Sequence, residues 1–156
     1  MADPGNAVIA RNPSAGHNFL LLETVEAGIE LTGAEVKSLR ARRTNLKDSF
    51  ARIDQGQAWL YGFDISPYPQ AGVRQEPKRI RRLLLHRTEI HRLDGQLARG
   101  GLTLVPTKVY FKGSFVKVEL ALAKRKREFD KRDTIRQREI DREISRALRH
   151  RVKGEG

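Results

Sequence analysis

TLVPTKVYF, residues Thr103–Phe111, and VKVELAL, residues Val116–Leu122, are two apolar stretches separated by a short segment that contains Gly113. Both stretches are rich in β-branched residues, which favour strands, and a short connection that contains glycine favours a tight turn. The pattern predicts a β-hairpin that closes a β-rich domain.

A second hairpin is predicted upstream of the first. Ser49–Ile53 and Ala58–Ile65 are rich in β-branched and aromatic residues, and Gly56 lies between them where a turn is needed. Nearer the N-terminus, Phe19–Val25 is an apolar run that suits a buried strand, and alternation resumes after Gly28. We therefore expect two short strands joined at this glycine.

Two helices are expected as well. Thr32 and Glu35 have the spacing of a capping box, so the first helix is predicted to begin at Thr32 and to end near Arg43.

Segment Ser66–Pro77, between the two helices, carries three prolines and a glycine, which predicts a long surface loop. The second helix is predicted to end at Gly100–Gly101, because apolar residues recur near helical spacing before it: Leu83, Leu84, Leu85, Ile90, Leu93 and Leu97.

About six strands and two helices in roughly 120 residues predict a mainly β protein with short helices. An OB-like, closed or partly closed antiparallel β-barrel fits this inventory, because closure removes exposed sheet edges. A ferredoxin-like sandwich is the structural alternative, but it requires a βαβ order. We expect a flexible N-terminal arm over residues 1–11, the barrel over residues 12–123, and a basic tail over residues 124–156.

The charge of the chain points to a polyanionic partner. It has 31 Lys and Arg against 19 Asp and Glu, a net charge of +12, and a field of that sign attracts polyanions and speeds their encounter. Nucleic acid is the leading partner class. Histones, ribosomal proteins and membrane-surface proteins share such a charge, so this number decides only the sign of the partner.

The composition also excludes several kinds of chemistry. The chain has no cysteine, which excludes disulfides, thiolate zinc sites and a cysteine nucleophile, and makes a reducing cytoplasm the simplest location. No apolar run approaches the roughly 20 residues that span a bilayer, and Met1–Asn6 lacks the features of a secretory signal. We expect a soluble, cytoplasmic protein that does not associate with membranes.

The tail has thirteen Lys and Arg against seven Asp and Glu in residues 124–156. Ile140, Ile144, Leu148 and Val152 recur at every fourth position, a helical stripe too thin for stability in isolation. We expect the tail to be disordered when free and helical on a partner, as many basic RNA-binding segments are. Phe129 beside these cations suits stacking on a base. The alternative is a tail that is merely solubilising.

Several blocks of the chain, taken in order, resemble the bacterial SsrA-binding protein family, SmpB. The resemblance covers roughly residues 12–145. The blocks are Glu26–Arg40 (EAGIELTGAEVKSLR), Asn45–Ser49 (NLKDS), Ile65–Tyr68 (ISPY), Arg82–His86 (RLLLH), Gly101–Pro106 (GLTLVP) and Asp130–Arg132 (DKR).

The resemblance implies an RNA-binding protein with an OB-like barrel that binds the tRNA-like domain of transfer-messenger RNA (tmRNA). It further implies that the complex enters stalled ribosomes for trans-translation, in which incomplete proteins are tagged and the ribosome is rescued. The tail would occupy the decoding centre and mRNA channel, next to small-subunit rRNA. Elongation factor Tu and alanyl-tRNA synthetase would be indirect partners through the RNA.

The resemblance also implies site residues. For RNA binding these are Asn12, His17, Glu26, Lys37, Ser38 and Arg40, with Lys124 and Lys126 at the start of the tail. For the decoding centre they are Phe129, Asp130, Lys131 and Arg132. Two departures from the family pattern are present: Pro13–Gly16 replaces basic residues, and Arg125–Arg127 replaces a Gly-Lys-Lys element.

Catalysis is not expected. His86 and His91 are five apart, so on a helix they point in different directions, unlike the pair in a zinc helix. The chain has no phosphate loop, nucleotide fingerprint or nucleophile elbow, so neither a metal nor a cofactor is predicted. The alternative function is that of a ribosomal-protein-like or initiation-factor-like component that binds rRNA. Sequencing the RNA that co-purifies with the protein distinguishes the two functions.

Overall fold

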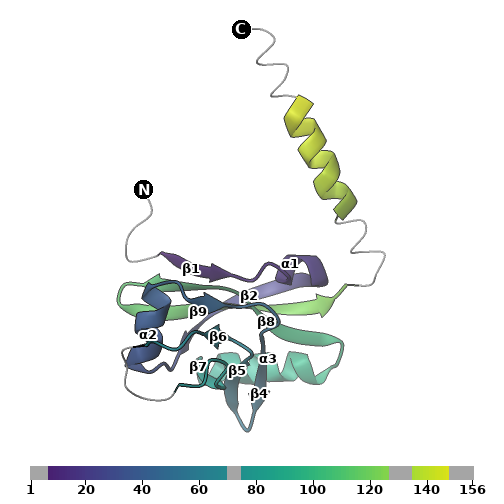
Figure 1. Ribbon diagram of the computed structural model, residues 1–156. Helices are drawn as coiled ribbons and strands as arrows, with labels where there is room; N and C mark the ends of the chain where they lie inside the picture. Colours follow the sequence, from purple (N-terminus) through teal and green to yellow (C-terminus); the bar gives the residue numbers. More distant parts are fainter. Residues whose placement is uncertain (1–6, 70–74, 127–134, 148–156) are drawn as a thin grey trace. The chain divides into compact units, whose positions relative to one another are not determined.

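A computed structural model describes residues 7–69, 75–126 and 135–147 of the chain. Figure 1 shows its helices and strands and labels most of them. The strands are β1 (Val8–Arg11), β2 (Phe19–Ile29), β3 (Thr44–Asn45), β4 (Phe50–Asp54), β5 (Gln57–Tyr61), β6 (Asp64–Ile65), β7 (Arg81–Leu84), β8 (Leu102–Lys112) and β9 (Phe115–Arg125). The helices are α1 (Ala15–Asn18), α2 (Gly33–Arg40) and α3 (Arg87–Ala98), and residues 135–147 are also helical.

The main sheet has the strand order β1-β8-β4-β5-β7-β2-β9, and β9 also pairs with β8. The pairing therefore returns to its start, and β8, β4, β5, β7, β2 and β9 form a ring in which every pair is antiparallel. Strands β4 and β8 pair through a single pair of residues, and strands β2 and β7 pair through two pairs of residues. The prediction of a mainly β, OB-like fold is confirmed as this ring of strands.

Side chains on the inner face of the ring form the core. Because residues alternate between the two faces of a strand, each strand gives every second side chain to this core. Burial of large apolar side chains contributes roughly 1.5–3 kcal/mol each to stability. Fully or almost fully buried members on the strands are Leu60, Leu83, Leu104, Val109, Val118 and Leu120, and Leu39 of α2, Leu93 of α3 and the loop residues Leu46 and Phe63 join them.

The β8–β9 hairpin confirms the first prediction and is longer than expected. Each strand has 11 residues, and Gly113 has a φ of 63° in the connecting turn. The register shifts between Pro106 and Lys108, and such an irregularity accommodates a proline that cannot donate a hydrogen bond to the ladder. Figure 1 shows these two long strands, with β2 beside β9.

The predicted break at Gly28 is wrong, because β2 is one strand that runs through it. Gly28 pairs with Leu84 on β7 and with Lys117 on β9. A Cβ atom at Gly28 would lie 3.2 Å from the Leu84 Cβ, so glycine here permits a close approach between strands and does not form a turn.

The second predicted helix is correct only in its later part. Leu83 lies in β7 and Leu84 ends it, whereas α3 begins at Arg87. The strand alternates between buried Arg81 and Leu83 and more exposed Arg82 and Leu84. Three consecutive leucines satisfy a helical and a strand pattern equally, and pairing with β2 and β5 decides between them.

The predicted capping box is present at the start of α2. Thr32 accepts a hydrogen bond from the Glu35 backbone N–H, and the Glu35 side chain accepts one from the Thr32 N–H. The helix ends at Arg40, three residues before the predicted end, and Arg42 has a φ of 58°. That left-handed conformation is incompatible with continuation of the helix.

The β4–β5 hairpin is confirmed, with Gly56 at a φ of 74° in its turn. The second predicted strand divides in two, because Gly62 has a φ of 75° and separates β5 from β6. β6 pairs with β3 in a separate two-stranded sheet. The described residues of the 66–77 segment contain no helix or strand, in agreement with the predicted loop.

The ends of the domain differ from those expected. Val8–Arg11, expected in a flexible arm, forms β1 and pairs with β8, and β9 continues to Arg125. The chain divides into compact units over residues 1–125 and 126–156. Every residue of the helix at 135–147 in the second unit is exposed. In the described residues, no helix has the length and apolarity needed to cross a membrane.

Candidate nucleic-acid interface

Glu26 lies on the outer face of β2, where β8 and β9 place hydrogen-bond donors around it. The Tyr110 hydroxyl donates to Glu26 Oε2, and Lys112 Nζ donates to Glu26 Oε1 at 3.1 Å. The Tyr110 hydrogen bond, together with Lys112 and Lys117, lowers the pKa of Glu26 against a smaller opposing effect of burial. The carboxylate is therefore charged and already bound within the protein, and it positions an aromatic hydroxyl and a lysine.

The other members of this outer face were not predicted from the sequence. Leu84, Lys117 and Tyr110 lie in one row across the sheet, because Leu84 pairs with Gly28, Gly28 with Lys117, and Lys117 with Tyr110. Leu84 is 45% exposed although it is apolar. Alternating cationic and aromatic residues on the predicted strand at 103–111 were the signal that could have revealed part of this face.

The same outer face has a second electrostatic contact. Lys108 Nζ lies 5.4 Å from the Tyr110 ring centroid and 3.3 Å from Glu119 Oε2. Burial and the hydrogen bond to Glu26 raise the pKa of Tyr110, so its hydroxyl keeps its proton at physiological pH. The face thus combines lysines, a neutral phenol and an exposed leucine, a set that can bind phosphate oxygens and pack against sugars and bases.

Asn12 has a local structural role. Its Nδ2 donates to the Pro106 carbonyl at 2.9 Å, while its Oδ1 accepts from the Ser14 hydroxyl at 2.9 Å and from the Ser14 N–H at 3.2 Å. These bonds tie the start of α1 to β8. His17 is half-buried on α1.

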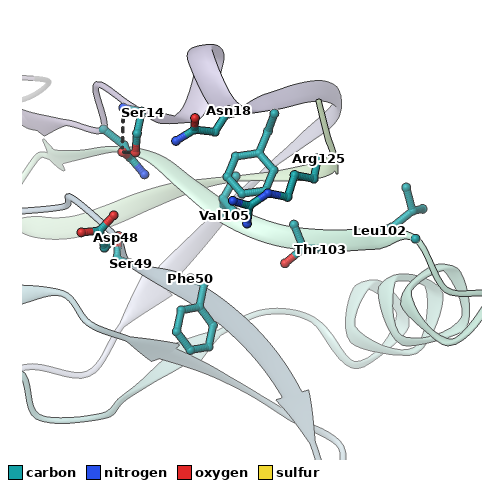
Figure 2. A pocket seen from close by; sticks show the side chains of 12 residues that line it. Ser14, Asn18, Asp48, Ser49, Phe50, Leu102, Thr103, Val105 and Arg125 are labelled. Carbon is teal, nitrogen blue, oxygen red and sulfur yellow. Dashed lines mark hydrogen bonds between the residues drawn. The ribbon is translucent and has the colours of Figure 1, made fainter. Parts of the chain in front are cut away.

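A pocket of about 510 Å³ lies beside α1, at the ends of β2, β4, β8 and β9. Arg125 is the single cation and Asp48 the single acid among its lining residues. Figure 2 shows Arg125 extended toward Val105 and Thr103, while Asp48 lies away from it next to Ser49. Polar and apolar side chains therefore both line the pocket.

Helix α2 carries three residues predicted to contact RNA, but only two of them are exposed. Lys37 and Arg40 are exposed, and Lys37 Nζ lies 5.4 Å from the Tyr68 ring centroid. Ser38 is completely buried, and its Oγ has no hydrogen-bond partner among the described residues. Ser38 faces the core beside Leu39, so its position does not support the predicted RNA contact.

A buried ion pair anchors α2. Arg81 Nη2 lies 2.6 Å from Glu35 Oε2, and Arg79 Nη2 lies 2.7 Å from Glu35 Oε1. Arg81 also donates to the carbonyls of Phe63, Arg79 and Pro77. This network holds the helix that carries Lys37 and Arg40 against β7 and the end of the 66–77 loop.

Of the two RNA-binding residues predicted at the start of the tail, one lies on β9 and one follows it. Lys124 is exposed on β9, where it pairs with Leu20 and Leu102, and Lys126 is half-buried just after the strand. The predicted decoding-centre residues Phe129, Asp130, Lys131 and Arg132 lie outside the described residues.

His86, one of the two histidines considered as metal ligands, has a structural role. His86 is the N-cap of α3, and its backbone N–H donates to Glu89 Oε1 at 3.4 Å. In residues 7–69, 75–126 and 135–147, no group of three or more His, Asp or Glu side chains is arranged to hold a metal ion.

Most of the chain also matches a known protein family. A family model described as "SmpB protein" matches residues 9–150. The chain belongs to the SmpB family. The family resemblance expected from the ordered sequence blocks is therefore confirmed.

Relatives and a solved structure agree with this assignment. An SsrA-binding protein from Carboxydothermus hydrogenoformans is 54% identical over 92% of this chain and 97% of the relative. An SsrA-binding protein from Desulforudis audaxviator is 53% identical over 96% of this chain and 98% of the relative. A chain in the structure "tmRNA-SmpB: a journey to the center of the bacterial ribosome" has a TM-score of 0.65 and 43% identity, over 81% of this chain and 94% of that one.

Proposed function

We propose that this protein binds the tRNA-like domain of tmRNA and delivers it to stalled ribosomes for trans-translation. The observation that carries the proposal is 54% identity to an SsrA-binding protein over nearly the whole of both chains. A solved relative whose name joins tmRNA, SmpB and the bacterial ribosome supports both partners. The rRNA-component alternative has no comparable support.

Two separate surfaces share the work in this proposal. The strand domain, with the outer face around Glu26, Tyr110 and Lys117, binds the folded RNA. The unit over residues 126–156, which includes the exposed helix at 135–147, acts in the decoding centre and mRNA channel through Phe129–Arg132. Contact with elongation factor Tu and alanyl-tRNA synthetase through the RNA stays a prediction.

Truncation after Lys126 tests this division, because it leaves β9 complete. The truncated protein is expected to bind a tRNA-like-domain transcript in gel shifts while tagging of proteins from a stop-codon-less message is abolished. The full-length Arg99→Gln variant, altered at the C-cap of α3, is the control for both assays. Equal loss of binding and tagging on truncation would contradict the division.

Sequencing the RNA that co-purifies with the full-length protein tests the partner itself. We expect tmRNA to be enriched over rRNA. In titrations with the purified transcript, log K should fall with log salt at a slope of about −0.7 to −0.9 per phosphate neutralised. A flat salt response, or rRNA without tmRNA, would contradict the proposal.

A further inference from the structure

The outer face of β4, β5 and β7 carries a row of side chains that the assigned site does not use. Arg52 pairs with Trp59, and Trp59 pairs with Arg82, so the three lie side by side across the three strands. Their strand neighbours Ala51, Ala58, Leu60 and Leu83 are buried, which places the row on the outside.

Aromatic rings next to this row are already stacked on one another. The Phe50 and Tyr61 ring centroids are 5.2 Å apart with an interplanar angle of 2°. The Arg52 guanidinium lies 5.2 Å from the Phe50 centroid and 5.9 Å from the Tyr61 centroid. Arg52 is thus held by two rings, and these contacts stiffen that side of the row.

Trp59 differs from its aromatic neighbours. It is half-buried, and among the described residues its indole makes no stacking, cation–π or hydrogen-bond contact. A tryptophan usually finds a partner for its N–H when it is withdrawn from water. Two arginines flank this ring without covering it, so it can accept a further planar group.

A basic pocket of about 370 Å³ adjoins the row, because Arg82 belongs to both, and Gln57, two residues before Trp59 on β5, also lines it. Arg82 Nε donates to Gln57 Oε1 at 3.0 Å, and an exposed, 3.4 Å contact joins Arg82 to Glu30. Arg87 and His91, on the first turns of α3, also line the pocket, and Asp94 is its acid. Within the described residues, the Arg87 and His91 side chains make no hydrogen bond or ion pair.

We infer that Trp59 and this pocket form a subsite for one unpaired RNA nucleotide, whose base stacks on the indole while Arg82 and Arg87 bind its phosphate. Base–aromatic stacking with nearby cations is the usual way to hold single-stranded RNA without reading its sequence. Arginine suits phosphate because it donates two parallel hydrogen bonds. The subsite rests on the proposed function only in that the partner is RNA.

This subsite is continuous with the Glu26 face. Leu84 follows Arg82 on the same face of β7 and pairs with Gly28 of β2. An RNA bound over Lys117 and Tyr110 can therefore extend across the sheet toward Trp59. The unpaired nucleotide can come from the tRNA-like domain itself or from a ribosomal strand, and its chemistry is the same in both cases.

Trp59 is the only tryptophan of the chain, so fluorescence excited at a wavelength that the three tyrosines do not absorb reports on this position alone. The full-length protein is titrated with a tRNA-like-domain transcript, with a single-stranded hexauridylate, and with polyphosphate, which has charge but no bases. Quenching by either RNA, and not by polyphosphate, is expected. Quenching by the transcript assigns the nucleotide to the tRNA-like domain, and quenching by the hexamer alone assigns it to another strand. Quenching by neither RNA overturns the subsite.

Variants give a second, independent measurement. Trp59→Leu should raise the Kd for the quenching RNA about tenfold, whereas Trp59→Phe should retain most of the affinity. Arg99→Gln, at the C-cap of α3 and outside the residues that line the pocket, is the control and should have no effect. Circular dichroism melting checks that each variant is folded, and the Phe variant keeps the test valid if the Leu variant does not fold.

The outcomes separate this subsite from the proposed function. If wild-type protein binds the tRNA-like transcript while Trp59 fluorescence and the Trp59→Leu affinity stay unchanged, the subsite is overturned and the proposed function stands. If the transcript does not bind but hexauridylate quenches Trp59, the subsite stands and the proposed function is overturned.

Discussion

Arg81 Nη2 lies 2.6 Å from Glu35 Oε2, and the Arg81 side chain is completely buried. Burial raises the pKa of Glu35, but hydrogen bonds from Arg79, the Thr32 backbone and Arg81 outweigh it and hold that pKa below its usual value. Burial lowers the pKa of Arg81, and Glu35 opposes this change. Each charge is therefore kept in the interior by the other.

Removal of one partner should be costly, because it leaves a buried charge uncompensated. Glu35→Gln keeps an oxygen for the capping box but removes the charge that faces Arg81. We expect a loss of about 3 kcal/mol in the free energy of unfolding, measured by urea denaturation. The double variant Glu35→Gln/Arg81→Met should lose less than the sum of the two single variants. Additive losses would show that the pair is not coupled.

Stability should fall in acid because of the same carboxylate. A folded pKa below the usual value of 4.5 means that the unfolded chain takes up protons first as the pH falls. The stabilisation is fully present above about pH 5 and is lost as the pH falls below 4.5 through the folded pKa. Urea denaturation from pH 7 to pH 3 should show this decline, with a shallower slope in Glu35→Gln. Identical slopes would exclude Glu35 as its source.

Gly62 and Gly56 form a matched pair of tests. Both have positive φ, 75° and 74°, but a Cβ atom at Gly62 would lie 3.1 Å from the Asp48 carbonyl oxygen, whereas at Gly56 it meets nothing within 4 Å. Gly56→Ala should cost about 1 kcal/mol of stability from backbone strain alone. Gly62→Ala should cost roughly 2 kcal/mol or more, because the backbone oxygen must also move. Equal melting temperatures for the two variants would contradict the close contact.

Ser38→Ala tests whether Ser38 contacts RNA. The Ser38 Oγ is buried and lacks a partner among the described residues, so its removal should leave stability unchanged or increase it by about 1 kcal/mol. Affinity for the tRNA-like transcript should not change. Arg40→Gln, on the exposed side of the same helix, should weaken that affinity. A loss of binding in Ser38→Ala with unchanged stability would restore Ser38 as a contact.

Local patterns predicted the features that depend on residues near one another in the chain. The capping box at Thr32 and Glu35 and the two hairpins around Gly56 and Gly113 needed only short-range geometry, and the structure has them. Leu83 and Gly28 were misread because their roles depend on strands far away in the sequence. A triple leucine or a strand glycine has no local feature that identifies its partner.

The amino-acid sequence by itself determined the β-rich class, the positive charge and the family, because composition, alternation and ordered motifs are properties of the chain. Only the tertiary structure decided which polar groups face inward or outward. It buried Arg81 and Ser38, engaged Glu26 with Tyr110, and aligned Arg52, Trp59 and Arg82 across three strands. The physical reason is that the solvation and neighbours of a side chain depend on strand register, and long-range pairing sets that register.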